Sequence, residues 1–319
     1  MQYGCLMPTM GPLANVDSVT RIARRAEELG YAWIAIPDHV VVPRTMEPNY
    51  PYSRSGAFAR AGMPFLDPLS SLSYLAGVTE RVRLLTSILV VPHRPAVVTA
   101  KQLASADRFS RGRIELGIGV GWMREEFEAI GAPDFDARGA VTDEYLDAFR
   151  TLWNAENESP EFHGRHVDFP PVEFLPTPVQ QPGLPVWVGG ESAPALRRTV
   201  ARGDVWYPVG NNPRFPMDTA ERYTRRRDRL FGLAEEGGRD PASLTLAYWA
   251  NWPMWQRRDA IDGGRHAFTG SEDEVASDIA AWRQMGVTRL MINTFVPDES
   301  EFLERLEWFM AEVAAKVAD

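Results

Sequence analysis

The sequence predicts an α/β fold, a (β/α)8 TIM barrel with insertion segments, and three observations support this. Short apolar runs alternate with amphipathic stretches along the chain, which is typical of repeated strand–helix units. Several runs are apolar on both faces, like strands buried between a barrel interior and outer helices. Eight such units in 319 residues fit one barrel domain spanning 1–319 better than the alternative, a doubly wound open sheet.

The predicted strands and helices alternate in order. The strands are expected at residues 2–8, 31–37, 81–92, 113–121, 184–190, 204–209, 244–252 and 287–295. The helices are expected at about 16–29, 67–79, 96–108, 139–153, 193–202, 216–235, 271–285 and 298–317. Gly30 suits the left-handed position that ends the first helix. Ser271 and Glu274 are spaced as a capping box at the start of another.

Two segments interrupt the alternation and are expected to be lid-like insertions over the barrel. Residues 43–66 are too long and too rich in Pro, Gly and aromatic residues for an ordinary connection. Residues 154–184 are rich in proline and contain the run "HGRHVDF". Because TIM barrels carry their chemistry at the carboxyl ends of the strands, we searched those ends for functional residues.

Composition narrows the possible functions. The net charge of −9 argues against nucleic-acid binding, which needs clustered Lys and Arg. No apolar run approaches the roughly 20 residues that cross a bilayer, and no secretory signal is recognised, so we expect a cytoplasmic protein without membrane contact. The single cysteine, Cys5, excludes an internal disulfide, and the five histidines lack metal-site spacing, so no metal is expected.

The second strand ends in "IPDHVVVP", which places Asp38 and His39 where a substrate-facing loop begins. A carboxylate beside an imidazole can orient the ring and adjust its charge near neutral pH, as proton transfer requires. The alternative is a loop-capping Asp next to a surface His.

The third strand contains "LLTSILVVPHRP", with two hydroxyls in an apolar setting. Thr86 and Ser87 must either bond back to the sheet or face a ligand. His93, after this strand, is expected to be an ordinary loop residue.

The fourth strand holds glycines at 117, 119 and 121, followed by Trp122. This spacing departs from the G-x-G-x-x-G of a dinucleotide loop. The three glycines share one face of a strand, so a close neighbour is expected there: another backbone, a helix or a flat ligand. The residues that alternate with these glycines could then face the barrel interior; they are Leu116, Ile118, Val120 and Trp122. Glu125, Glu126 and Glu128 are expected on a solvated helix face, with a catalytic role as the alternative.

The fifth strand ends in "VWVGGESAPALRR". Gly189 and Gly190 allow the backbone to approach a ligand, and Ser192 can begin a helix whose free N–H groups attract an anion. This is the best phosphate candidate in the sequence, although Glu191 adds an unfavourable charge and an ordinary turn is an equal alternative.

These motifs together resemble the luciferase-like monooxygenase superfamily, in particular its coenzyme F420-dependent oxidoreductase branch. The similarity rests on "LASADRFSRGRIELGIGVGWMREEFEAIG", "WIAIPDHVVVP", "LLTSILVVPHRPAVVTAKQLA" and "LPVWVGGESAPALRRTVARGDVWYPV". It spans most of residues 1–210 in the family's order, and the last third matches mainly in its alternation of strand and helix patterns.

The resemblance implies a homodimeric, bacterial luciferase-like barrel with a deazaflavin or flavin at the strand ends. Asp38 and His39 match a pair that lies against the cofactor ring, with the His assisting proton transfer. Ser87 and Ile88, after Thr86, match a bulge behind the ring that often contains a cis peptide. The remaining cofactor-binding residues implied are Val120, Gly121 and Trp122 beside the ring, and the phosphate turn Val188, Gly189, Gly190, Glu191 and Ser192. Trp122 replaces the catalytic Glu of the sugar-phosphate dehydrogenases in this superfamily.

We therefore expect an F420-dependent oxidoreductase that transfers a hydride to or from a small organic molecule. The alternatives are an FMN-dependent monooxygenase that uses reduced flavin and oxygen, and a non-catalytic barrel that only binds the cofactor. The substrate is expected to be apolar or aromatic, because aromatic residues gather in the first insertion and after the seventh strand. These are Tyr50, Tyr52, Phe58, Phe65, Trp249, Trp252 and Trp255.

Overall fold

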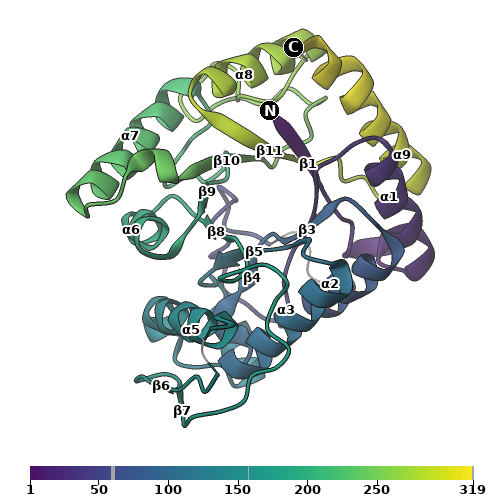
Figure 1. Ribbon diagram of the computed structural model, residues 1–319. Helices are drawn as coiled ribbons and strands as arrows, with labels where there is room; N and C mark the ends of the chain where they lie inside the picture. The colour runs from purple at the N-terminus through teal and green to yellow at the C-terminus, as the bar shows by residue number, and fades with distance from the viewer. Residues whose placement is uncertain (59–61, 157, 318–319) are drawn as a thin grey trace.

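A computed structural model describes residues 1–58, 62–156 and 158–317, and it confirms the (β/α)8 barrel (Figure 1). The barrel sheet has the strand order β3-β2-β1-β11-β10-β9-β8-β5-β4, and a further β3–β5 pairing closes it. All pairings within this sheet are parallel. Its strands are β1 (Gln2–Leu6), β2 (Trp33–Ile36), β3 (Arg83–Thr86), β4 (Leu89–Val90), β5 (Ile114–Gly119), β8 (Val186–Gly189), β9 (Val205–Tyr207), β10 (Thr245–Ala250) and β11 (Val287–Ile292).

The third predicted strand, 81–92, is broken in the structure. β3 ends at Thr86, β4 begins at Leu89, and the peptide bond between Ser87 and Ile88 is cis. A short 3-10 turn over Val91–His93 then leads to the next helix. The prediction of one continuous strand was therefore wrong, whereas the cis bulge implied by the family resemblance is present.

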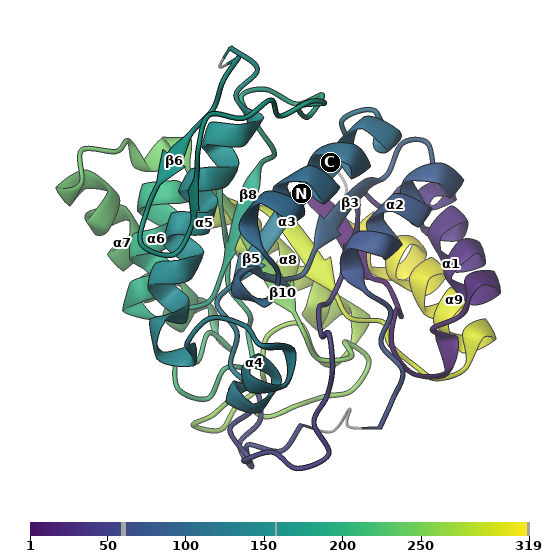
Figure 2. The same cartoon turned by 90° about the horizontal axis from the view of Figure 1, so that it is seen from below.

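The helices surround the barrel: most of them form its outer ring (Figure 1), and the short helix Arg124–Ile130 lies at one end of it (Figure 2). They are α1 (Val16–Glu28), α2 (Pro68–Val78), α3 (Ala96–Ser110), α4 (Arg124–Ile130), α5 (Arg138–Trp153), α6 (Ala193–Arg202), α7 (Ala220–Glu236), α8 (Glu272–Gln284) and α9 (Glu299–Trp308). Gly30 follows α1 with a φ of 85°, as predicted. The predicted capping box at Ser271 and Glu274 is confirmed. After α9 the chain continues in π and 3-10 turns to Val317.

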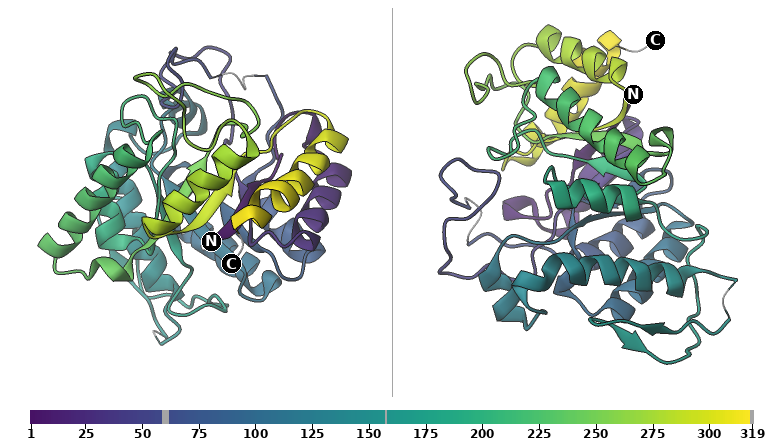
Figure 3. Two further views of the ribbon diagram at one scale, coloured as in Figure 1. Left: turned by 90° about the horizontal axis from the view of Figure 1, so that it is seen from above. Right: turned by 90° about the vertical axis from the view of Figure 1, so that its left-hand side faces the viewer.

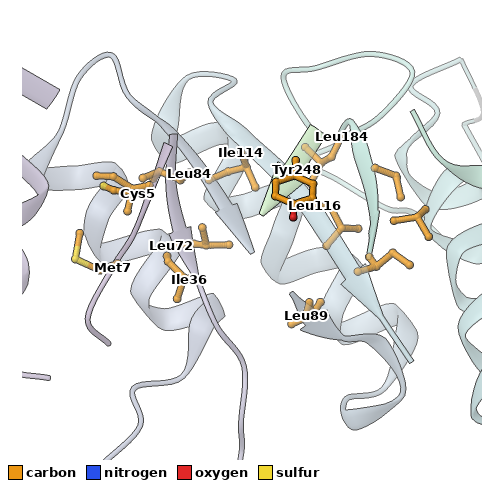
Figure 4. Packing of buried hydrophobic residues seen from close by; sticks show 14 of the residues in the cluster. Cys5, Met7, Ile36, Leu72, Leu84, Leu89, Ile114, Leu116, Leu184 and Tyr248 are labelled. Carbon is orange, nitrogen blue, oxygen red and sulfur yellow. The ribbon is translucent and has the colours of Figure 1, made fainter. Parts of the chain in front are cut away.

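Two apolar clusters hold the barrel together. The larger one lies between the strands and the outer helices; Figure 4 shows some of its members, among them Ile36, Leu84 and Leu116 from strands and Leu72 from α2. The smaller one fills the barrel interior with Trp33, Leu85, Trp187, Tyr207 and Met291 among its members. The interior is therefore a packed core of aromatic and aliphatic side chains, as expected for a barrel of this size.

The glycines of β5 face the barrel interior. A Cβ atom on Gly117 would lie 1.9 Å from the Thr86 carbonyl oxygen, and one on Gly119 would lie 1.8 Å from Cδ1 of Ile88. Only glycine leaves room for the bulge between β3 and β4. Leu116 and Ile118 belong to the helix-facing cluster, so the expectation that their set faces the interior was wrong.

The two long insertions lie at opposite ends of the barrel (Figures 2 and 3). The described part of 43–66 follows β2 and lies near α4, at the carboxyl ends of the strands. Residues 154–184, with a small hairpin of β6 (Phe162–His163) and β7 (Asp168–Phe169), precede β8. The Gln180 side chain donates to the Ile114 carbonyl at the start of β5. The expectation that 154–184 forms a lid over the site was therefore wrong, because this segment covers the amino ends of the strands.

Candidate functional site

His39 lies at the mouth of the barrel, just after β2, and its partner is Glu126 from α4. The distance between His39 Nδ1 and Glu126 Oε2 is 2.8 Å. The Glu126 side chain is only 1% exposed, and that of His39 is 12% exposed. Because Nδ1 is bonded to the carboxylate, Nε2 is the ring atom that can face a substrate.

The Glu126 carboxylate is held in its charged form. Burial alone would raise its pKa, but the hydrogen bond and charge of His39, the charge of His93 and the Val40 N–H hold the pKa below its usual value. The Val40 and Val41 N–H groups donate to its Oε1 at 2.7 and 3.2 Å. The expectation that Glu126 lies on a solvated helix face was wrong.

Asp38 is buried and pairs with Arg94 instead of with His39. Its two carboxylate oxygens accept hydrogen bonds from the Arg94 guanidinium at 2.8 and 2.9 Å, and one also accepts from the Val90 N–H. Arg94 bonds in addition to Asp67, the N-cap residue of α2. The structure thus keeps the predicted location of Asp38 but makes Glu126, four residues after Trp122, the acid that orients the imidazole.

Aromatic residues of the 43–66 segment pack over His39. The His39 ring centroid lies 5.0 Å from that of Phe58 and 5.2 Å from that of Phe65. Trp122 lies 6.3 Å from His39 and 5.1 Å from Tyr50. The described part of this segment therefore covers the mouth as a lid, and Trp122 forms part of the same aromatic cluster.

A cavity of about 690 Å³ borders His39. Its other lining residues are Val40, Val41, Val42, Pro43, Arg44, Gly62, Met63, Pro64 and Phe65. Val40, Val41 and Met63 are exposed apolar side chains on its rim. A volume of this size suits a small organic ligand, and the cavity surface is both polar and apolar.

Of the predicted bulge residues, only some can contact a ligand. Thr86 is fully buried, and its hydroxyl donates to the Gly117 carbonyl at 2.7 Å, so it bonds back to the sheet. The Ser87 hydroxyl lies 3.0 Å from that of Tyr207. Ile88 is half-buried at the mouth, with its side chain between Gly119 and Gly189.

Val120, Gly121 and Trp122 are half-buried at the mouth directly after β5, where they were predicted. Gly121 has a φ of 86°, and a Cβ atom there would lie within 3 Å of Phe127 and Val90 side-chain atoms. Its carbonyl accepts a hydrogen bond from Arg138. Glycine is thus required at 121 both by its backbone conformation and by its neighbours.

A turn leads from β8 into α6 at the residues that were predicted to bind phosphate. Gly190 has a φ of 108°, and the Ser192 side chain caps α6. The Glu191 carboxylate points away from the turn and accepts hydrogen bonds from the Val209 N–H and the Asn212 side chain. Its burial raises its pKa from 4.5 to about 7. Val188 is fully buried, so the side chains of Val188 and Glu191 support this turn from behind and do not line it.

A second cavity of about 580 Å³ lies between the lid and the loops after β9 and β10. Trp252 and the neighbouring Arg258 contribute to its wall, with 5.0 Å between the guanidinium carbon and the ring. Trp249 stacks on Tyr207, whereas Trp255 packs against Trp308 of α9. The aromatic residues after the seventh strand are therefore divided between interior, cavity wall and outer surface.

Two negative findings apply to residues 1–58, 62–156 and 158–317. No cluster of His, Cys, Asp and Glu side chains in these ranges is arranged to hold a metal ion. None of the helices described there is both long enough and apolar enough to span a membrane.

A family model described as luciferase-like monooxygenase matches residues 2–252. The chain belongs to this family. Because the family consists of monooxygenase-like enzymes, the chain is assigned to the oxidoreductases. The match includes His39, Glu126 and the turn after β8, so the site described above lies within the family region.

The chain is also similar to individual proteins and solved structures. An uncharacterized protein of Mycobacterium tuberculosis (strain H37Rv) is 34% identical over 219 residues, which cover 68% of this chain and 72% of that protein. The FMNH2-dependent dimethylsulfone monooxygenase of Pseudomonas putida is 36% identical over 140 residues, 43% of this chain and 38% of that enzyme. The solved structure of an F420-dependent secondary alcohol dehydrogenase superposes with a TM-score of 0.73 and 16% identity, covering 100% of this chain and 99% of the other; this shows a shared fold.

Proposed function

We propose that this chain is a coenzyme F420-dependent oxidoreductase that transfers a hydride between the deazaflavin and a small apolar or aromatic substrate. The observation that carries the proposal is the His39–Glu126 pair at the barrel mouth, beside a cavity of about 690 Å³. Hydride transfer to an organic acceptor requires one proton, and this pair can hold and release one.

The residues at the mouth fit a flat cofactor with an anionic tail. Ile88 offers an apolar surface backed by Gly119 and Gly189, and the 690 Å³ cavity borders the imidazole. At the turn after β8 the Glu191 charge is directed elsewhere, so the backbone around Gly190 and Ser192 is free of the repulsion expected from sequence. Residues suited to hold the cofactor are Ser87, Ile88, Val120, Gly121, Trp122, Gly189, Gly190 and Ser192.

When bound, F420 supplies a hydride donor or acceptor that carries carbon where a flavin has N5. His39 in its cationic form holds the transferable proton at Nε2 and donates it to the substrate atom that gains negative charge. Glu126 stabilises the imidazolium and keeps Nδ1 protonated after the transfer. Phe58 and Phe65 of the lid pack on the His39 ring and limit its contact with water.

A second candidate is an FMN-dependent monooxygenase that uses reduced flavin and oxygen. It is favoured by the similarity to the Pseudomonas dimethylsulfone monooxygenase over 140 residues. The same imidazole and turn would serve a flavin mononucleotide, since both cofactors present a tricyclic ring and a phosphate.

Titration of the apoprotein with F420 and with FMN, followed by cofactor fluorescence, tests the proposal. We expect F420 to bind at least about tenfold more tightly than FMN, a difference of about 1.4 kcal/mol. A preference of that size for FMN would overturn the proposal in favour of the second candidate. Tight binding of F420 without turnover of any alcohol, aldehyde, imine or enone would instead support the non-catalytic barrel.

A further inference from the structure

His93, in the 3-10 turn after β4, is an imidazole that the proposed reaction does not use. Its side chain is only 2% exposed, and neither ring nitrogen has a hydrogen-bond partner among the described residues. A neutral imidazole has one donor and one acceptor nitrogen, and burying either without a partner is costly. The Glu126 Oε1 atom lies 3.9 Å from His93 Nδ1.

Glu126 therefore lies between two imidazoles. Its Oε2 bonds to His39 Nδ1 at 2.8 Å, and its Oε1 is directed toward Val40, Val41 and His93. His93 is fixed from the other side by Phe127, with 4.8 Å between the ring centroids. Since Phe127 follows Glu126 in α4, the same helix sets the position of the carboxylate and of the second ring.

The remaining charges near His93 are paired with one another. Asp38 and Arg94 form a bidentate ion pair, and Arg94 also bonds to Asp67. Burial lowers the pKa of His93, while the charges of Glu126 and Asp38 oppose this effect and those of Arg94 and His39 add to it. One carboxylate, Glu126, is thus left to compensate two rings, and it can balance only one imidazolium.

We propose that Glu126 is shared by His39 and His93, and that His93 is a positioning residue beside the carboxylate oxygen that His39 does not bond, so that the protonation of each ring affects the other. His39 donates its Nδ1–H to Oε2 in both of its protonation states, and a positive charge on either ring opposes a positive charge on the other. Removing either ring then raises the pKa of the other, because the coupling is reciprocal. The meaning of this coupling for catalysis rests on the proposed function, whereas the coupling itself does not.

NMR titration of the imidazole signals in the full-length protein, labelled at histidine, tests the proposal without any cofactor. In His93→Phe, which keeps an aromatic ring against Phe127, we expect the His39 pKa to rise by about 0.5 to 1 unit. His93→Gln keeps a donor near Glu126 and should give a smaller rise. In His39→Gln the His93 pKa should rise by a similar amount. The limb of the kcat–pH profile assigned to His39 should move with its pKa.

The matched control is His266→Phe, which removes another buried histidine with an unpartnered ring nitrogen. It should leave the His39 titration unchanged. If His93→Gln folds and the His39 and His93 titrations do not respond to each other in any variant, the proposal is overturned and His93 only fills space. Turnover with FMN in place of F420 would refute the proposed function. The coupling between the two histidines could still be measured in that case.

Discussion

Each end of the barrel contains a buried glutamate, and the two differ in what surrounds them. Glu115, near the amino ends of the strands, accepts hydrogen bonds from Arg83, Arg289 and the Trp187 indole N–H. Arg289 also lies over the Trp33 and Trp187 rings. Glu126, at the carboxyl ends, has imidazoles and backbone amides around it.

The difference distinguishes a carboxylate that stabilises the fold from one that can take part in proton transfer. Arginine stays protonated at any working pH, so Glu115 forms a permanent ionic network that fixes neighbouring strands. Histidine exchanges its proton near neutrality, so the charge balance around Glu126 can change during a reaction. The end with titratable partners also carries the lid and the cavity that borders His39, whereas residues 154–184 cover the end with permanent charges.

The largest expected effect comes from removing the imidazole at the mouth. His39→Ala should lower kcat by about 10²- to 10⁴-fold, because the proton donor is lost, while the dissociation constant for the cofactor changes by less than about threefold. Steady-state kinetics and fluorescence titration measure the two quantities. His163→Ala, at an exposed histidine of the β6–β7 hairpin, is the control. Equal turnover in His39→Ala and the parent protein would remove His39 from the mechanism.

Breaking the network at the opposite end should affect stability and not proton transfer. Glu115→Gln leaves Arg83 and Arg289 without their carboxylate and should lower the free energy of unfolding by about 3 kcal/mol, with the pH profile of kcat unchanged. Chemical denaturation measures the loss. Glu301→Gln removes an exposed pair with Arg305 and should cost less than about 0.5 kcal/mol. A changed pH profile in Glu115→Gln would contradict the division between the two ends.

A smaller effect is expected from Glu191, a third buried glutamate, behind the turn after β8. Its folded pKa is raised to about 7, so the folded state binds this proton more tightly than the unfolded state does. Its contribution to stability is complete below about pH 4.5 and is lost as the pH rises through 7, at most about 3 kcal/mol. Unfolding free energies at pH 5, 6, 7 and 8 should show this decline in the parent protein and a weaker one in Glu191→Gln. Identical declines would show that another group is responsible.

Much of the fold could be predicted from the sequence because it depends on local patterns of apolar and polar residues. Alternating apolar runs and amphipathic stretches gave eight strand–helix units, and the helix ends at Gly30 and Ser271 followed from local backbone and capping chemistry. The location of His39 at a strand end also followed, since a parallel barrel brings all such ends to one face. The hairpin β6–β7 was not predicted, because each of its strands has only two residues.

The partners of the site residues depended on contacts between distant segments. Glu126 is 87 residues from His39, and Arg94 is 56 residues from Asp38. Sequence adjacency favoured Asp38 as the acid for His39. The acidic residues around Glu126 suggested an exposed helix face and gave no indication that Glu126 is buried. The signal that could have identified Glu126 is the Phe127 beside it, since an apolar neighbour in a short helix after a strand end indicates burial.

The sequence by itself determined the eight-unit barrel, the family and the place of the imidazole, because periodicity and strand ends are local properties of the chain. Only the tertiary structure decided which acid serves His39, which face of β5 the bulge occupies and which insertion covers the mouth. These depend on the packing of α4 against the loop after β2 and on the register of β3 with β5. Such contacts join residues far apart in the chain, so local pattern does not encode them.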